Sequence, residues 1–269
     1  MNFNEKLAAI IKKNKSLVCV GLDPDPELMP EKVTVTEFNK AIIDATADLV
    51  CAYKPNFAFY EAMGEEGMAA LRDTVKHIPT SIPIIGDAKR GDIGNTAKAY
   101  AKAIFSNLNF DAATVSPYLG FDSIEPFIQY KDKGVFILCR TSNAGALDFQ
   151  ALQIKDKNLS LFEMVARKAS EWNKYGNIGL VVGATYPEEL KLIRQSYPDM
   201  PILIPGVGAQ GGDLALTIRY GVDAQGVKTI INSSRQIIYA SRQKDFALAA
   251  RRAAQTLRDQ INQNLPASK

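Results

Sequence analysis

Eight short apolar runs, each followed by a longer amphipathic stretch, constrain the fold of this 269-residue chain more than any other feature. The runs have the length of strands, and the stretches between them have helical periodicity. The apolar runs are Leu17 to Leu22, Leu49 to Tyr53, Ile82 to Gly86, Ala112 to Ser116, Val135 to Cys139, Ile178 to Val182, Ile202 to Ile204 and Val227 to Ile231. The helix-like segments include Val35 to Ala47, Gly64 to His77, Gly94 to Asn107, Ser160 to Lys174 and Pro187 to Ser196. This alternation indicates parallel β/α units, and eight such units close naturally into a barrel.

An open, doubly wound sheet is the main structural alternative, because it is assembled from the same β/α units. Such sheets usually carry a glycine-rich fingerprint after the first strand, whereas this chain continues with Gly21-Leu22-Asp23-Pro24. No linker rich in proline, glycine or serine divides the chain. We therefore predict an α/β fold in which residues 1–269 form one domain, a single (β/α)8 TIM barrel.

The composition argues against several classes of partner. Lysine plus arginine number 32 against 29 for aspartate plus glutamate, and no basic block stands out, so charge gives no reason to expect nucleic acid. Charges are spread through the segment from Met1 to Ser16, and no run approaches the ~20 apolar residues of a membrane span. The three cysteines, Cys19, Cys51 and Cys139, lie far apart in apolar runs, which is typical of buried reduced thiols. We expect a cytoplasmic protein without a membrane or nucleic-acid partner.

Charged residues stand at the ends of the first three apolar runs. The first run ends in Asp23, the second in Lys54, and the third continues as Asp87-Ala88-Lys89-Arg90-Gly91-Asp92. In a barrel of parallel strands, the chemistry is located at the C-terminal ends of the strands. These side chains are therefore predicted to meet at one end of the barrel, with Lys54, Asp87, Lys89 and Asp92 as an array of alternating charge.

Local spacing supports this array. Strand periodicity would place Asp87 and Lys89 on one face, with Ala88 pointing toward the helices. Gly91 permits a sharp turn that would bring Asp92 back toward the same pocket. The alternative for any one of these residues is an ordinary surface ion pair, which is common and weak. Four charges buried together cost much desolvation and contribute little stability, so the group indicates a functional site.

Two further segments favour a phosphate ligand. The seventh run continues as Pro205-Gly206-Val207-Gly208-Ala209-Gln210-Gly211-Gly212-Asp213, whose glycines can expose backbone N–H groups. The eighth run continues as Asn232-Ser233-Ser234-Arg235, and the planar guanidinium of Arg235 suits phosphate oxygens. Phosphate sites in barrels often follow the seventh and eighth strands. The sequence therefore predicts a phosphate ester as the ligand.

These segments together resemble a known family. Asp87-Ala88-Lys89-Arg90-Gly91-Asp92-Ile93-Gly94-Asn95-Thr96 is similar to the Asp-x-Lys-x-x-Asp-Ile-Gly-Asn-Thr signature of orotidine 5′-phosphate decarboxylases. Tyr53-Lys54-Pro55-Asn56, Gly21-Leu22-Asp23, the loop from Pro205 to Gly212, and Arg235 match in the family's order. Lys89-Arg90-Gly91-Asp92 and the stretch from Ser116 to Asp122 resemble the bacterial type 2 subgroup. The resemblance covers nearly the whole barrel.

The resemblance implies a carboxy-lyase of pyrimidine biosynthesis that converts orotidine 5′-phosphate to UMP and CO2 without metal or cofactor. Lys89 would donate the proton to C6, Asp87 would lie beside the departing carboxylate, and Lys54 would orient the array. Asp92 and Thr96 would come from the partner subunit of a homodimer. This chemistry fits the residues, because loss of CO2 leaves an electron pair on a ring carbon that only fixed charge can stabilise.

The resemblance also implies how the substrate is held. Asp23 would bind a ribose hydroxyl, Ser142 the pyrimidine edge, and Gln210 with Arg235 the phosphate. The predicted substrate-binding residues are Asp23, Thr96, Ser142, Pro205, Gly206, Gly208, Gln210 and Arg235.

Two other functions remain open alternatives. A sugar-phosphate decarboxylase or aldol-type synthase of the same superfamily shares the Asp-x-Lys-x-x-Asp core but uses Mg2+ with an acidic residue at the second strand, where this chain has Lys54. A non-catalytic nucleotide-binding barrel would use the charges for affinity alone. The first would lose activity to a chelator, and the second would bind product without releasing CO2.

Overall fold

The computed structural model describes residues 1–207 and 212–265. The strands of its main sheet are β1 (Val18–Leu22), β2 (Ala52–Pro55), β3 (Ile85–Arg90), β4 (Ala112–Val115), β5 (Gly134–Arg140), β8 (Ile178–Val182), β9 (Ile202–Ile204) and β10 (Thr229–Ser233). They form an eight-stranded sheet in the order β2-β1-β10-β9-β8-β5-β4-β3. Isolated parallel bridges, Tyr53 to Ile84 and Asn56 to Asp87, join the second strand to the third. The sheet therefore closes on itself, and the predicted (β/α)8 barrel is confirmed.

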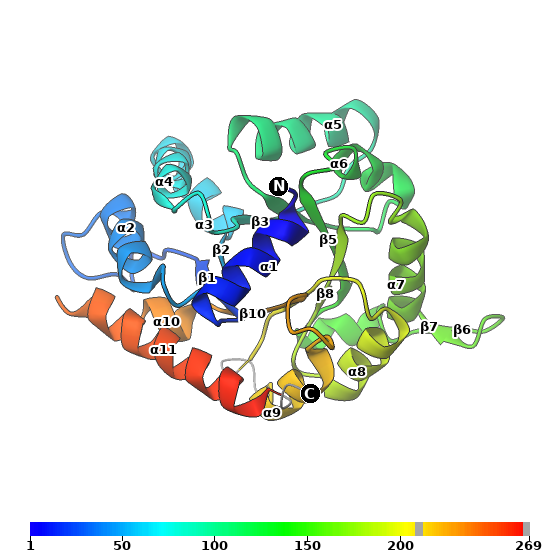
Figure 1. Cartoon of the computed structure of the whole chain (residues 1–269). Helices are drawn as coiled ribbons and strands as arrows, with labels where there is room; N and C mark the ends of the chain where they lie inside the picture. The colour runs from blue at the N-terminus through cyan, green and yellow to red at the C-terminus, as the bar shows by residue number, and fades with distance from the viewer. Residues whose placement is uncertain (208–211, 266–269) are drawn as a thin grey trace.

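Helices surround the barrel and cover the outer faces of its strands (Figure 1). They are α1 (Phe3–Asn14), α2 (Val35–Thr46), α3 (Phe57–Glu61), α4 (Gly64–His77), α5 (Gly94–Lys102) with its π-helical continuation η1 (Ala103–Asn107), η2 (Phe121–Ser123), α6 (Glu125–Ile128), η3 (Ala144–Asp148), α7 (Leu161–Trp172), α8 (Pro187–Ser196), α9 (Leu214–Gly221), α10 (Arg235–Ile238) and α11 (Phe246–Asn264). A small hairpin, β6 (Gln153–Ile154) and β7 (Leu159–Ser160), lies outside the barrel. All five helical segments predicted from the sequence are present with nearly the predicted bounds.

Capping residues explain where two of these helices begin. Thr34 precedes α2, and its side chain accepts a hydrogen bond from the backbone N–H of Glu37, whose carboxylate accepts one from the backbone of Thr34. Ser160 and Glu163 form the same reciprocal pair at the start of α7. Each pair satisfies N–H groups that a helix otherwise leaves without partners. The capping residues in the local sequence therefore determine where these two helices begin.

The first helix closes the N-terminal end of the barrel. In Figure 1, α1 lies across the strands, and the ring of Phe3 packs edge-on against Phe136 of β5 with centroids 5.5 Å apart. Gly134, at the start of β5, leaves room for this ring, because a Cβ there would lie 2.8 Å from Phe3. Lys6 also forms a 2.8 Å ion pair with Asp111. The opposite end of the barrel is left for a ligand.

Three strands lie further along the chain than the sequence indicates. The apolar run from Leu49 to Tyr53 corresponds to β2, which begins at Ala52 and includes Lys54, paired in register with Gly21 of β1. The apolar run from Ile82 to Gly86 corresponds to β3, which begins at Ile85 and continues to Arg90. The last run was expected from Val227, but β10 begins at Thr229. The strand periodicity assumed for Asp87 and Lys89 already implied charged side chains within β3. Their burial cost is offset by partners that the closed barrel supplies.

The cysteines behave as expected. Cys19, Cys51 and Cys139 are buried and form no disulfide. Burial raises the pKa of the Cys19 thiol to about 12, so it stays protonated and acts as a small apolar side chain. Among residues 1–207 and 212–265, no helix has both the length and the apolar character needed to cross a membrane.

Candidate active site

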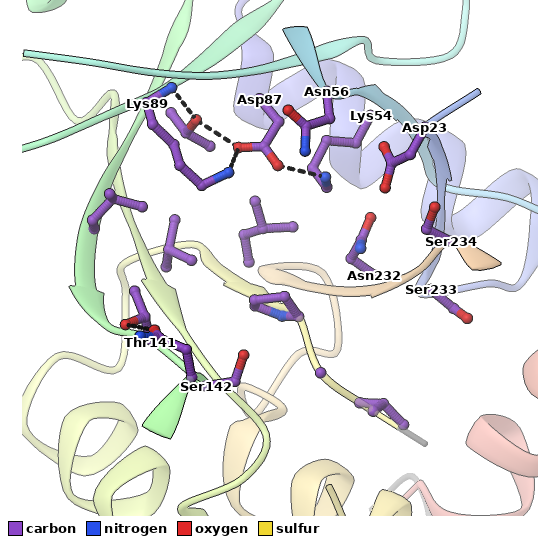
Figure 2. Close-up of a pocket in the computed structure, with 18 of the residues that line it drawn as sticks. Asp23, Lys54, Asn56, Asp87, Lys89, Thr141, Ser142, Asn232, Ser233 and Ser234 are labelled. Carbon is purple, nitrogen blue, oxygen red and sulfur yellow. Dashed lines mark hydrogen bonds and ion pairs between the residues drawn. The ribbon is translucent and has the colours of Figure 1, made fainter. Parts of the chain in front are cut away.

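A cavity of about 570 Å³ occupies the C-terminal end of the barrel. Polar residues from several strands line it together, as Figure 2 shows for the labelled side chains. The predicted site residues that line it are Asp23, Lys54, Asp87, Lys89, Ser142, Pro205, Gly206 and Arg235. The barrel therefore brings together charges that are far apart in the sequence.

The carboxylate of Asp87 is the centre of the charged group. Its Oδ2 accepts a hydrogen bond from Lys54 Nζ at 2.7 Å, and its Oδ1 accepts one from Lys89 Nζ at 2.6 Å. The hydroxyl of Thr114 donates to the same Oδ1 at 2.9 Å. We refer to Lys54, Asp87 and Lys89 as the charged array. One carboxylate thus joins two ammonium groups (Figure 2).

Burial differs across the array. The side chains of Lys54 and Asp87 are 5% and 11% exposed, whereas that of Lys89 is 50% exposed. Burial lowers the pKa of Lys54, but the carboxylates of Asp87 and Asp23 outweigh this effect and hold the pKa above its ordinary value. Burial raises the pKa of Asp87, but Lys54 and Lys89 outweigh it and hold that pKa well below its ordinary value. At neutral pH the two buried groups are therefore charged.

The backbone of β3 places Lys89 by an irregularity and not by strand alternation. The pairing of β3 with β4 shifts between Gly86 and Arg90, and Lys89 has a φ of 47°. For a residue with a Cβ, this left-handed conformation costs about 1–2 kcal/mol. The expectation of a regular two-residue period through Lys89 was wrong, because a bulge interrupts the strand. Asp87 and Lys89 still both line the pocket.

A second part of the pocket holds acceptors without partners. Asp23 Oδ1 and Asn232 Oδ1 are buried and have no hydrogen-bond partner within the described part of the chain. Both residues line the pocket, and Figure 2 places Asn232 near Asp23 and Lys54. Buried acceptors are nearly always satisfied in folded proteins. This part of the pocket is therefore prepared for a ligand that carries hydroxyl donors.

The predicted phosphate end combines a glycine turn and an arginine. Gly206 follows β9 and has a φ of 92°, a conformation that favours glycine. Arg235 is the first residue of α10, next to Ser233 and Ser234, which also line the pocket. The expected residues Gly208 and Gln210 lie outside the described residues. Pro205, Gly206 and Arg235 thus share one pocket with the charged array.

The loop after β5 presents Ser142 to the pocket. The backbone N–H of Thr141 donates to Gln150 Oε1 at 2.8 Å, and Gln150 Nε2 donates to the Thr141 hydroxyl at 2.9 Å. Gly183 permits close packing, since a Cβ there would lie 2.8 Å from that of Ser142. The hydroxyl of Thr141 also donates to Asn143 Oδ1 at 2.7 Å, so the residues on both sides of Ser142 are held by side-chain contacts.

Asp92 and Thr96 do not line the pocket of their own chain. Asp92 Oδ1 accepts a hydrogen bond from the backbone N–H of Ile93 at 2.7 Å, and Thr96 is exposed in the first turn of α5. The turn at Gly91 therefore does not return Asp92 to this pocket. Ile93 is 52% exposed and Tyr118 is 85% exposed, so large apolar side chains are uncovered around this segment.

Several lining residues were missed in the sequence. Thr114 and Asn232 lie in the fourth and last strands of the main barrel sheet, and Asn56 and Gln150 also line the pocket. A polar residue near the end of an apolar run was an available signal for Thr114 and Asn232. Gln150 had no such signal, because a loop carries it to the pocket. Within residues 1–207 and 212–265, no cluster of three or more His, Cys, Asp or Glu side chains is arranged to hold a metal ion.

The fold and the charged array define an enzyme built on a (β/α)8 barrel. Comparison with known proteins identifies which one. Residues 16–250 match the model of the orotidine 5′-phosphate decarboxylase / HUMPS family, and the chain belongs to this family. It is therefore a carboxy-lyase, like its curated relatives.

Several relatives span nearly the whole chain. The orotidine 5′-phosphate decarboxylase of Dehalococcoides mccartyi strain CBDB1 is 57% identical over 264 residues, covering 97% of this chain and 98% of that relative. Among solved structures, the orotidine 5′-phosphate decarboxylase (OMP decarboxylase) of Leishmania donovani has a TM-score of 0.86 at 42% identity and covers 98% of both chains. The UMP synthase of L. donovani has a TM-score of 0.86 at 43% identity; the match covers 97% of this chain but only 57% of that longer one.

Proposed function

We propose that this chain converts orotidine 5′-phosphate to UMP and CO2, by metal-free decarboxylation with protonation of C6 by Lys89. The observation that carries the proposal is the buried Asp87 carboxylate held between Lys54 and Lys89 in a nucleotide-sized pocket. The names of the relatives support the substrate, since those reported above act on orotidine 5′-phosphate or belong to UMP synthesis.

The reaction needs one proton and no redox step. The bond between C6 and the carboxylate breaks, CO2 departs, and the electron pair remains on C6. The ammonium of Lys89 offsets this negative charge and transfers a proton to C6, which gives UMP and a neutral lysine. The side chain of Lys89 is half exposed, so solvent can return the proton after each turnover. The cycle thus balances without another reactant.

The other two members of the array hold Lys89 in place. Asp87 accepts a hydrogen bond from Lys89 Nζ and would lie beside the departing carboxylate. Lys54 is buried and charged, so it keeps Asp87 ionised and oriented from the opposite side. Fixed charges of this kind need no reorganisation when the negative charge develops on C6, which is the source of their catalytic effect.

Groups away from C6 bind the nucleotide. Asp23 has an unpaired Oδ1, which suits a ribose hydroxyl, and Ser142 is assigned to the pyrimidine edge. Arg235 offers a planar fork to the phosphate, next to Pro205 and Gly206. The predicted roles of Gly208 and Gln210 at the phosphate concern residues outside the described part. Such remote contacts can order the site around the reacting carbon.

Electrostatics favour a reaction without a metal ion. Each oxygen of Asp87 already accepts a hydrogen bond from a lysine, and Lys54 occupies the position where the Mg2+-dependent rivals carry an acid. A divalent cation placed there would be repelled by two ammonium groups. We therefore favour the decarboxylase over the Mg2+-dependent alternative.

We also propose a homodimer in which Asp92 and Thr96 complete the partner's pocket. In support, Asp92 does not line the pocket of its own chain. The exposed side chains of Ile93, Tyr118 and Leu119 provide an apolar surface nearby. A two-fold interface would cover this surface on both subunits. The cytoplasmic location expected from the sequence stays a prediction.

The test uses purified protein that has been dialysed against a chelator. We expect it to deplete the ultraviolet absorbance of orotidine 5′-phosphate without added metal or cofactor. Lys89→Ala should remove nearly all turnover yet retain UMP binding, because the ammonium matters most when C6 becomes negative. Lys191→Ala, a half-exposed helical lysine away from the pocket, is the matched control. Strict dependence on Mg2+, or UMP binding without CO2 release by the wild type, would contradict the proposal.

A further inference from the structure

The hydroxyl of Thr114 makes two contacts that the proposed reaction leaves unexplained. Thr114 lies in β4 and is 1% exposed. Its Oγ1 donates to Asp87 Oδ1 at 2.9 Å and accepts a hydrogen bond from the backbone N–H of Lys89 at 3.0 Å. Lys89 Nζ in turn donates to the same Asp87 Oδ1 at 2.6 Å. The backbone and the ammonium of Lys89 are therefore both tied to the pair Thr114 and Asp87. Figure 2 shows the contact between the side chains of Lys89 and Asp87.

The register of the strands explains why a side chain is needed here. Gly86 pairs with Ala113, and the next pair is Arg90 with Val115. Three residues of β3 between these pairs, Asp87 to Lys89, thus face the single residue Thr114. The backbone of β4 offers too few hydrogen-bonding groups for this longer segment, so the Thr114 hydroxyl accepts the hydrogen bond from the N–H of Lys89.

The directions of these hydrogen bonds fix the orientation of the Thr114 hydroxyl. A threonine hydroxyl has one proton, and the Asp87 carboxylate can only accept it. The lone pairs of Oγ1 then face the N–H of Lys89, which can only donate. The same hydroxyl therefore orients the carboxylate and anchors the backbone of Lys89 in its left-handed conformation.

We propose that Thr114 is a positioning residue that sets the placement of the Lys89 ammonium. It acts through Asp87 and through the bulge in β3, and it needs no contact with the reacting carbon. The kinetic consequence rests on the proposed function, whereas the effect on the geometry of Lys89 does not.

A buried threonine elsewhere in the barrel provides a matched control. Thr229 begins β10, is fully buried, and donates its hydroxyl to the carbonyl of Gly221 at 3.0 Å. It does not line the pocket. Replacing either threonine by valine removes a buried hydroxyl at nearly constant volume. Only Thr114 should affect turnover if its role is positioning.

Thr114→Val is expected to lower kcat by about 10- to 100-fold, because a catalytic group displaced by about 1 Å loses rate on this scale. The dissociation constant of UMP should change by less than about threefold, since the ribose and phosphate contacts remain. Thr114→Ser keeps the hydroxyl and should recover kcat to within about threefold of wild type. Thr229→Val should lower the unfolding midpoint but leave kcat unchanged. If Thr114→Val does not fold, Thr114→Ala is measured in its place.

Three results would overturn the inference: wild-type kcat in Thr114→Val, a serine variant as slow as the valine variant, or UMP affinity that falls in step with kcat. The last two would indicate a packing role. If the wild type does not decarboxylate orotidine 5′-phosphate, the proposed function fails by itself. In that case a crystal structure of Thr114→Val tests the inference. The inference requires that Lys89 leaves its contact with Asp87 in this variant, and it fails if the contact is unchanged.

Discussion

Removing the carboxylate at the centre of the charged array should destabilise the fold strongly. In Asp87→Asn, the ammonium groups of Lys54 and Lys89 lose the negative charge that both of them contact. Lys54 is the critical partner, because its side chain is only 5% exposed and is largely shielded from water. A buried charge left without its partner is among the few causes of large destabilisation by one substitution.

The size of the effect follows from the geometry. Two unit charges 2.7 Å apart, as in Lys54 and Asp87, attract by about 6 kcal/mol at an effective dielectric constant of about 20. The asparagine avoids the desolvation cost of the carboxylate, and its oxygen can still accept one hydrogen bond from Lys54, worth about 1 kcal/mol. Breaking buried pairs typically costs about 3–5 kcal/mol, and we expect a loss of about 3 kcal/mol at neutral pH.

The pH dependence gives a second signature. In the wild type the pKa of Lys54 lies above its unfolded value, so its contribution is present below about pH 10 and is lost as pH rises through the folded pKa. In Asp87→Asn, burial, the largest influence on this pKa, is opposed mainly by the carboxylate of Asp23 and would lower the pKa below the unfolded value. The variant should therefore regain stability as Lys54 loses its proton. The difference in stability should therefore be largest near neutral pH and narrow as pH approaches about 10.

Lowering the pH should also reduce the stability of the wild type, in this case through Asp87. The pKa of Asp87 lies below its unfolded value, so its contribution is present above about pH 4 and is lost as pH falls toward the folded pKa. Asp87→Asn lacks this carboxyl group, and its stability should fall less in the same pH range. The difference in unfolding free energy between the wild type and Asp87→Asn should thus shrink at both low and high pH.

Urea unfolding, followed by the fluorescence of the single tryptophan Trp172, measures these differences. Asp199→Asn is the matched control, because Lys228 and Asp199 are 2.8 Å apart but Asp199 is 92% exposed. That variant should be nearly as stable as the wild type. A loss under about 1 kcal/mol in Asp87→Asn, or a difference that does not vary with pH, would refute the reasoning.

Two further predictions concern the ligand and the partner subunit. Arg235→Ala should weaken binding of UMP but hardly affect the unphosphorylated nucleoside, because the proposed contact of the lost fork is with the phosphate alone. Equal losses in titrations with both ligands would assign Arg235 a structural role. Lys89→Ala and Asp92→Ala, each expected to be inactive, should rescue each other when unfolded and reassembled together, because in the proposed dimer one pocket of every mixed dimer is free of both lesions. Equal mixing makes about half the dimers mixed, so about a quarter of wild-type activity is expected. No recovery in demonstrated mixed dimers would place Asp92 within its own subunit.

The barrel and the charged residues that line its pocket were predictable from local sequence. The alternation of apolar runs with amphipathic segments reflects the separate burial of strand and helix faces, and it predicted all eight strands of the main sheet. Charged residues at the ends of several apolar runs, such as Asp23 and Lys54, indicate a site at the strand ends when they occur together. The family signature around Asp87 is likewise local, so it was recognisable without coordinates.

The tertiary structure decided the interactions between these residues. No pattern in β3 and β4 predicts that three residues from Asp87 to Lys89 face Thr114 alone, because register depends on how the whole barrel closes. The left-handed backbone of Lys89 and the hydroxyl that supports it arise from that register. Sequence therefore determined which groups are present, through local burial and chemistry, whereas their distances and charge states depend on contacts between strands that are far apart in the chain.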